Sequence, residues 1–237
     1  MRNILLISFL LVRVFAMAQG PGDDMLAGMS ALRKEDHPAA ETAFSRAVVS
    51  EPSNAKTWYY RGVNRLTSGD AQGAVSDLDQ ALKLAPDDVH SLLRRAEART
   101  QLGAEQMATS DLHRVIELRP TGPATEHALL QLGNFSMAKN DLVTAKGFYD
   151  RLVGIAPLNA FGWCDRGIVL AAMHMDDEAL VDLDKAIGID PTLDQAHVNK
   201  AIILFRMDRR QEGCFALQQA HDLGDTSVEE LMLIYCR

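Results

Sequence analysis

Five prolines at a nearly constant spacing constrain the fold of this chain more than any other feature. Pro52, Pro86, Pro120, Pro157 and Pro191 follow one another at intervals of 34, 34, 37 and 34 residues. A fixed period of this length is typical of stacked repeats, each of which is one supersecondary unit. Aligning the chain on these prolines therefore tests whether other positions repeat as well.

Several other columns repeat in this register. Two columns of small residues contain Gly28, Gly62, Ala96, Gly133, Gly167 and Ala201, and then Ala40, Ala74, Ala108, Ala145, Ala179 and Gly213; a large apolar column contains Phe44, Leu78, Leu112, Tyr149, Leu183 and Leu217. Small side chains let two antiparallel helices approach closely, and apolar residues at helical spacing fill the seam. Proline ends each second helix because it cannot continue one. The sequence thus predicts an all-α chain of helix pairs.

This pattern resembles the tetratricopeptide repeat family over residues 21–227. The second repeat has the most family positions, at Trp58, Gly62, Gly69, Asp70, Ala74, Leu78, Ala81 and Pro86. The resemblance implies a right-handed superhelical solenoid and a non-catalytic scaffold that binds a protein or peptide. The expected repeats cover residues 21–54, 55–88, 89–122, 126–159, 160–193 and 194–227, and a capping helix is expected over 228–237.

Two connections depart from the regular repeat, one between the third and fourth repeats and one before the capping helix. The longer 37-residue step places residues 123–125 between two repeats, and we expect a looser joint there. At the C-terminal end, Ser227 followed by Glu230 has capping-box spacing. The apolar face of the capping helix, expected to cover the last repeat, consists of Leu231, Ile234 and Tyr235.

The first 18 residues differ from the repeats. A short basic start precedes an apolar run from Ile4 to Val12, and Ala16-Met17-Ala18 is a small-x-small cleavage signal. This layout predicts a secretory signal peptide, because the apolar run is too short to span a membrane. We expect a mature chain that begins at Gln19 and is exported, either periplasmic or secreted.

The charge of the chain disfavours nucleic acid and anionic membrane as partners. The full chain has 24 basic and 32 acidic residues; without Arg2 and Arg13 of the leader, 22 basic residues remain and the net charge is −10. Such a chain repels polyanions unless its basic residues gather on one face, and no basic run is present.

An arginine column and an aspartate column occur together in three repeats. Their members are Arg61 with Asp77, Arg95 with Asp111, and Arg166 with Asp182. The first and fourth repeats lack both residues, and the sixth has Lys200 instead. We interpret each pair as a structural ion pair between the two helices, in preference to an acid/base pair or an anion site.

No arrangement of residues predicts catalysis, a metal or a cofactor. The seven histidines are scattered and form no metal-binding spacing with each other or with carboxylates. A Gly-rich phosphate loop and a nucleophile elbow are both missing from the sequence. We therefore expect no enzyme activity and no cofactor, and an enzyme of unrecognised class is the least favoured alternative.

The cysteines near the C-terminus carry a second resemblance. Gly213-Cys214, Leu223-Gly224 and Tyr235-Cys236 are similar to the endings of exported tetratricopeptide repeat proteins of Bacteroidetes-type bacteria. In an oxidising compartment, a Cys214–Cys236 disulfide would join the last repeat to the capping helix. It would contribute about 3 kcal/mol in the chain-entropy model. The alternative is two buried thiols, and Cys164 remains as a packing or groove residue.

The resemblance also indicates where a partner would bind, because first helices line the concave face in this family. The expected groove residues are Tyr59, Val63, Leu93, Glu97, Leu130, Asn134, Ile168, Val198, Ile202 and Phe205; Phe161, Cys164 and Ala172 share this face. Co-chaperone members of the family grip a carboxylate with Lys, Asn and Arg. The corresponding columns here include Asn134 and Asp165 and never supply that set, so a carboxylate clamp is not expected.

The groove becomes more apolar toward its C-terminal half, which favours an amphipathic helix or apolar peptide as ligand. Two alternatives remain open. Ile168, Val198, Ile202 and Phe205 can instead pack between neighbouring repeats. They can also be buried in a homo-oligomer, in which case the protein is mainly structural.

Overall fold

The computed structural model describes residues 21–236, so the predicted signal peptide lies outside the described residues. The chain divides into two compact units, one ending at Leu84 and the other beginning at Ala85. The first unit contains α1 (Pro21–Arg33), α2 (His37–Ser50), α3 (Ala55–Thr67) and α4 (Ala71–Leu84). The second contains α5 (Val89–Gln101), α6 (Glu105–Leu118), α7 (Pro123–Ala138), α8 (Leu142–Ile155), α9 (Ala160–Ala172), α10 (Asp176–Ile189), α11 (Asp194–Arg206), α12 (Arg210–Asp222), a 3-10 turn (Thr226–Val228) and α13 (Glu229–Tyr235).

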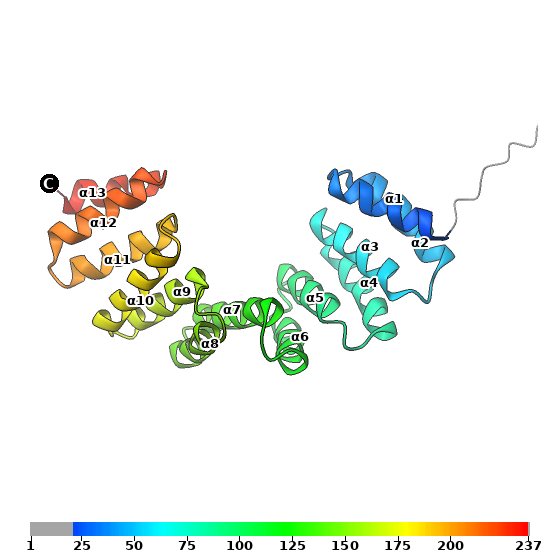
Figure 1. The fold of residues 1–237 in the computed structure, drawn as a ribbon, viewed down its shortest axis with the longest axis horizontal. Helices are drawn as coiled ribbons and strands as arrows, with labels where there is room; N and C mark the ends of the chain where they lie inside the picture. The colour runs from blue at the N-terminus through cyan, green and yellow to red at the C-terminus, as the bar shows by residue number, and fades with distance from the viewer. Residues whose placement is uncertain (1–20, 237) are drawn as a thin grey trace, which may run out of the picture. The chain divides into compact units, whose positions relative to one another are not determined.

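The predicted all-α repeat fold is confirmed. Consecutive helices pack as pairs, α1 with α2 and α3 with α4 in the first unit, and α5 to α12 as four pairs in the second (Figure 1). Helices α3, α5, α9 and α11 begin at the first residues of the corresponding expected repeats. Each unit therefore buries its own seams between helix pairs, as expected of stacked repeats.

Each helix pair turns through one residue in the left-handed region of the backbone. The residues at this column are Glu35, Gly69, Gly103, Asn140, His174 and Asp208, with φ between 58° and 89°. Glycine adopts this conformation without strain, and Asn and Asp tolerate it better than most residues do. The short turn brings the two helices of a pair back to back, so the small columns face each other.

The large apolar column and the first small column fit together at the crossing of each pair. A Cβ on Gly133 would lie 2.5 Å from the ring of Tyr149, and a Cβ on Gly28 would lie 2.4 Å from the ring of Phe44. Where the large residue is Leu112, the small residue is Ala96, and both are buried. The two aromatic rings therefore occur opposite glycine because no larger residue leaves room for them.

In the second, fifth and sixth repeats, one column links the repeat to the end of the preceding one. The ring nitrogens of Trp58, Trp163 and His197 lie 2.9, 3.0 and 3.2 Å from the carbonyl oxygens of Pro52, Pro157 and Pro191. The proline that ends a repeat thus leaves a carbonyl without a helical partner, and the next first helix supplies a donor to it.

The prediction of a looser joint at residues 123–125 is wrong. These residues form the first turn of α7, which begins at Pro123 and is 16 residues long. Proline is well accommodated at the first position of a helix, because its missing N–H would have no intrahelical partner there. The three extra residues therefore lengthen a helix.

The C-terminal end differs from its prediction in two details. Asp225, and not Ser227, supplies the capping oxygen, which accepts from the Ser227 amide at 2.9 Å. Leu231 and Met232 pack against the last core cluster, whereas Ile234 is 60% exposed. Ile234 therefore does not cover the last repeat as expected, because α13 packs on the last core cluster through Leu231 and Met232 instead.

Candidate functional site

The first helices of the second unit lie together on one side of it, which we call the first-helix face. Helix α5 contacts α7, and α9 contacts α11, while α6, α8 and α10 each contact the first helices on either side. Side chains that leave α5, α7, α9 and α11 on this face are thus the ones that approach each other across neighbouring pairs. This is the face on which the sequence predicted a groove.

On α9 the face consists of one stripe of residues. Phe161, Asp165 and Ile168 are spaced by four and three residues and therefore share one side of the helix. Phe161 is 53% exposed, and Ile168 is partly buried against the neighbouring core. On the adjacent helix α11, Ile202 is 48% exposed. An exposed apolar surface is therefore present here, with one acid inside it.

The acid in this stripe has no counter-charge. Within residues 21–236 the Asp165 carboxylate forms neither a hydrogen bond nor an ion pair, although the side chain is partly buried. Burial raises the pKa of Asp165 to about 6, because the charged form loses hydration that no protein group replaces. A strongly perturbed carboxyl on an accessible face is a candidate for binding.

The charge of Asp165 acts on Tyr149, and Tyr149 is hydrogen-bonded to Asn134. Tyr149 is buried in α8, and its hydroxyl donates to Oδ1 of Asn134 at 2.7 Å. Burial, and after it the charge of Asp165, raises the pKa of the Tyr149 phenol. The predicted groove residue Asn134 therefore anchors a core side chain.

Further along the face, α5 and α7 enclose a small cavity of about 100 Å³ whose lining includes Leu93, Glu97 and His127. Glu97 is paired with Arg94 at 2.8 Å. Burial lowers the pKa of His127, so the imidazole is neutral at pH 7. Leu130, also predicted to line the groove, is partly buried beside this cavity on α7. This part of the first-helix face therefore offers only a small cavity, and its acid Glu97 already has a partner within the protein.

Two predicted groove residues pack at the C-terminal end of the unit. Val198 and Phe205 lie against the core cluster that includes Leu217 and Val228. The Phe205 ring stacks on Tyr235 with 4.6 Å between centroids. For Val198 and Phe205, packing between neighbouring elements describes the structure better than an open groove does. Ile202, between them in sequence, stays exposed.

The remaining two predicted residues, Tyr59 and Val63, belong to the first unit. Tyr59 meets the edge of Tyr60 at 5.1 Å, and Tyr60 stacks on Phe44 at 6.0 Å. Val63 is partly buried. Tyr59 is therefore part of an aromatic cluster on α3.

The structure brings together all three predicted Arg–Asp pairs. The shortest N–O distances are 2.7 Å for Arg61–Asp77, 2.6 Å for Arg95–Asp111 and 2.6 Å for Arg166–Asp182. Each aspartate is buried and receives two nitrogens of its arginine. This geometry joins the two helices of a pair and leaves no lone pair directed at a ligand, as a structural role requires.

These pairs are parts of larger networks that the columns did not predict. Arg65 lies 3.0 Å from Asp77, and Arg99 lies 2.6 Å from Asp111. Both arginines follow the predicted ones by four residues, so they share a helix face with them. That spacing was the available signal. The first repeat, expected to lack a pair, contains Arg46–Asp24 at 2.8 Å between other columns.

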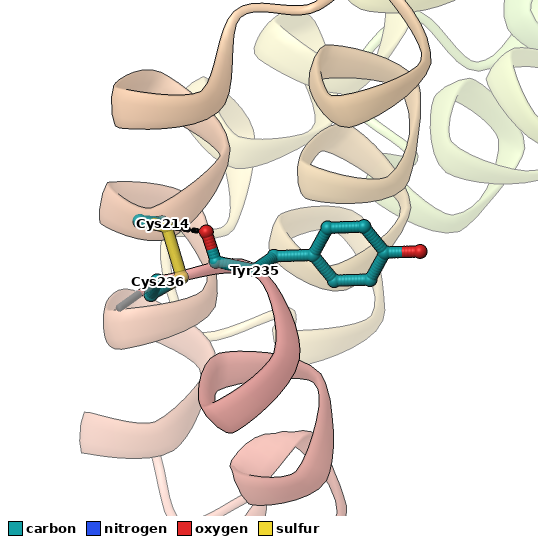
Figure 2. The surroundings of a disulfide bond; sticks show 3 residues. All are labelled: Cys214, Tyr235 and Cys236. Atoms are coloured by element: carbon teal, nitrogen blue, oxygen red, sulfur yellow. Dashed lines mark hydrogen bonds between the residues drawn. A yellow bond between two sulfur atoms is a disulfide. The ribbon is translucent and has the colours of Figure 1, made fainter.

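The C-terminal cysteines form a disulfide that attaches α13 to α12. Cys214 and Cys236 are bonded, with 5.5 Å between their Cα atoms. Figure 2 shows the carbonyl of Tyr235 directed at Cys214 and its ring directed away from the disulfide. The 3.6 Å approach of the Tyr235 oxygen to Cys214 Sγ is a contact only, since a disulfide sulfur has no hydrogen to donate.

Cys164 is the free thiol and is buried in α9. Burial first, and then the charges of Asp165 and Asp194, raise its pKa to about 12. A nucleophilic cysteine requires the opposite shift. Cys164 is thus a packing residue.

Residues 21–236 contain no group of three or more His, Cys, Asp or Glu side chains that would hold a metal ion. In the same residues, no helix is both long and apolar enough to cross a membrane.

Comparison with known proteins supports the repeat assignment. The tetratricopeptide repeat family model matches residues 25–88 and 64–123. The small glutamine-rich tetratricopeptide repeat-containing protein 2 of Saccharomyces cerevisiae is 25% identical over 104 residues, which are 44% of this chain and 30% of that protein. The chain thus spans less than a third of this relative. Residues 25–123 therefore match the tetratricopeptide repeat pattern.

Solved structures show the same fold. The structure of pilF from Pseudomonas aeruginosa is similar with a TM-score of 0.75 at 14% identity, covering 92% of this chain and 97% of that one. YrrB, described as a tetratricopeptide repeat protein with an unusual peptide-binding site, has a TM-score of 0.62 at 17% identity, covering 78% and 95%.

Proposed function

We propose that this protein is a non-catalytic scaffold that binds a segment of another protein on the first-helix face of its second unit. The observation that carries the proposal is the exposed apolar surface of Phe161 and Ile202 on the adjacent helices α9 and α11. Apolar side chains on the face where first helices converge suit an apolar or amphipathic segment. YrrB, which shares the fold and has a peptide-binding site, supports a peptide as the kind of ligand.

Panning a displayed library of random 12-residue peptides tests this proposal without a known partner. We expect wild type to enrich a family of related peptides, and Ile202→Glu to lose them because a charge then meets the apolar ligand. Val181→Glu is the matched control. Val181 is an exposed aliphatic residue on the second helix α10, at 67% exposure.

Each outcome of the panning has a defined meaning. Loss with Ile202→Glu and retention with Val181→Glu supports binding on the first-helix face, provided that both variants melt near the wild-type temperature. Equal retention by both variants contradicts it. A library that yields no enriched family on wild type also contradicts it.

We also propose that the protein works outside the cytoplasm, in the periplasm or as a secreted protein. Residues 1–18 have the layout of a signal peptide. The Cys214–Cys236 disulfide supports the proposal, since disulfides persist in oxidising compartments. Mass spectrometry of the protein expressed with its leader tests it: we expect a mature chain that begins at Gln19 and contains the disulfide, and an uncleaved cytoplasmic chain would contradict export.

A second candidate is a homo-oligomer with a structural role. Leu233 and Ile234 on α13 are 57% and 60% exposed, an apolar surface at a chain end where repeat proteins usually have a polar cap. Light scattering across a hundredfold range of concentration separates the two functions. A dimer that dissociates with Ile234→Glu would favour the structural role, and a monomer throughout would exclude it.

A further inference from the structure

The first-helix face contains a carboxylate, Asp165, whose surroundings favour the binding of a cation. Asp165 is flanked on its own helix stripe by Phe161 one turn earlier and Ile168 one turn later. No hydrogen-bond donor and no basic side chain among residues 21–236 meets its oxygens. The acid is therefore an unsatisfied group inside an apolar strip, which a ligand is free to occupy.

Other acids in the same repeat unit show that partial burial does not by itself leave an aspartate unpaired here. Asp182, on the helix that packs against α9, binds two nitrogens of Arg166. Asp150 on α8 lies 3.1 Å from a third nitrogen of the same arginine. Arg166 directly follows Asp165 in sequence, but it points to α8 and α10 and leaves the carboxylate of Asp165 alone.

The charges around Asp165 also favour a cation. From α8 the Tyr149 hydroxyl is within the electrostatic field of Asp165, and it donates to Asn134 on α7. From α11, Asp194 acts together with Asp165 on the thiol of Cys164, so a second carboxylate contributes to the same negative field. An anionic ligand would be repelled here. A metal ion would find no set of three ligand side chains in residues 21–236.

We propose that Asp165 recognises a lysine or arginine side chain of the bound segment, with apolar residues of that segment on Phe161 and Ile202. This inference rests on the proposed function, and it adds the chemistry of the ligand. The stripe spacing on α9 fits a segment in which the basic residue has apolar neighbours on both sides. Pairing with a cation would restore to Asp165 the stabilisation that it loses on burial.

The test uses peptides enriched on the wild-type protein and measures their affinities by fluorescence anisotropy at pH 7.5. We expect the enriched family to share a lysine or arginine between apolar residues. Replacing that residue by norleucine should weaken binding to wild type about tenfold or more, and should have little effect on binding to Asp165→Asn. Glu178→Gln is the control for the change in net charge, because it removes the charge of an exposed acid on the second helix α10.

The affinity of wild type for the peptide should also depend on pH, and that of Asp165→Asn should not. Wild type should bind more weakly at pH 5 than at pH 7.5, because protonated Asp165 no longer attracts the cation, and Asp165→Asn should show no such loss. Tyr149 and Cys164 stay protonated over this range, and His127 is present in both proteins, so their difference isolates Asp165.

The possible failures are distinguishable. Peptides that lose affinity with Ile202→Glu but bind wild type and Asp165→Asn equally would leave the first-helix face in place and overturn the role of Asp165. Enriched peptides without a basic residue would overturn it as well. Peptides unaffected by either variant would overturn both the role of Asp165 and the proposed binding face.

Discussion

Two acids of the second unit, Asp182 and Asp165, are placed in contrasting ways around the same helix pair. Asp182 is 3% exposed and holds Arg166 through two hydrogen bonds of 2.6 and 2.7 Å. Asp165, one residue before that arginine, has no cationic partner within residues 21–236, and burial raises its pKa to about 6. The first acid joins α10 to α9, and the second faces the surface that we propose binds a partner.

This difference shows how a repeat protein separates stability from binding. A buried acid with a matched arginine fixes the geometry of the helix pair, and removing one member leaves the other stranded. An acid without a partner destabilises the free protein, because its charged form is desolvated and uncompensated. Such a group gains a counter-charge only when a ligand binds. The electrostatic stabilisation of that pair then contributes to the affinity for the ligand.

The strongest test of this contrast is the removal of the paired acid, which should have the largest effect on stability. Asp182→Ala should lower the free energy of unfolding by about 3 kcal/mol or more, because it leaves Arg166 partly buried with only Asp150 nearby. Urea denaturation followed by circular dichroism measures this change. A loss below about 1 kcal/mol would mean that the pair contributes as little as an exposed one does.

A double variant provides the control for that experiment. The fourth repeat has Leu132 and Phe148 at the columns of the arginine and the aspartate. Copying them with Arg166→Leu and Asp182→Phe together should lose less stability than Asp182→Ala alone, since apolar packing replaces the pair without a stranded charge. A larger loss would show that the fifth repeat cannot pack the apolar residues that the fourth repeat has at these two columns.

The unpaired acid should respond in the opposite direction. A pKa raised from 3.8 to about 6 disfavours the charged native state, so Asp165→Asn should raise the free energy of unfolding by up to about 3 kcal/mol at pH 7.5. Between pH 6 and pH 4 the native state binds the proton more tightly than the unfolded chain does. Wild type therefore gains stability from this group as the pH falls, and the difference between the two proteins should shrink toward pH 4 and vanish only below it.

Denaturation of both proteins at pH 7.5 and pH 4.5 measures this difference, and other carboxylates cancel because they are common to both. A destabilised Asp165→Asn at pH 7.5 would mean that Asp165 has a stabilising partner, and it would remove the contrast with Asp182.

The smallest effect concerns the phenol between the core and the face. Tyr149→Phe removes the hydrogen bond to Asn134 and should lower the free energy of unfolding by about 1 kcal/mol, since the amide of Asn134 is exposed and can bind water instead. The pKa of Asp165, followed by NMR, should stay raised because burial is its cause. A further rise would indicate that the Tyr149 hydroxyl also stabilises the charged form.

Much of the architecture was predictable from residue columns. The recurrence of Gly or Ala opposite Leu, Phe or Tyr located the helix crossings, and the joint occurrence of arginine and aspartate located Arg61–Asp77 and its two equivalents. The three extra residues at 123–125 indicate an insertion but not its form, and they extend α7 because proline begins helices readily. Arg65 and Arg99 were missed because only one arginine column was compared.

The candidate site was only partly predictable. Column positions placed Ile202 and Asp165 on first helices, but helical spacing cannot say whether an apolar residue is covered. Phe205 is covered because the ring of Tyr235, 30 residues later in sequence, stacks on it. Ile202 is on the same helix and remains open. That distinction depends on where α13 packs.

The sequence by itself determined the repeat, the helix pairs and the charged pairs inside them, because these follow from local periodicity and from residues a fixed number of positions apart. The tertiary structure alone decided which side chains stay exposed and which acid stays unpaired. Exposure and pairing depend on elements that pack from other repeats. Among residues 21–236, Asp165 has no cationic partner because Arg166 is directed toward α8 and α10, and only the packing of three helices sets that direction.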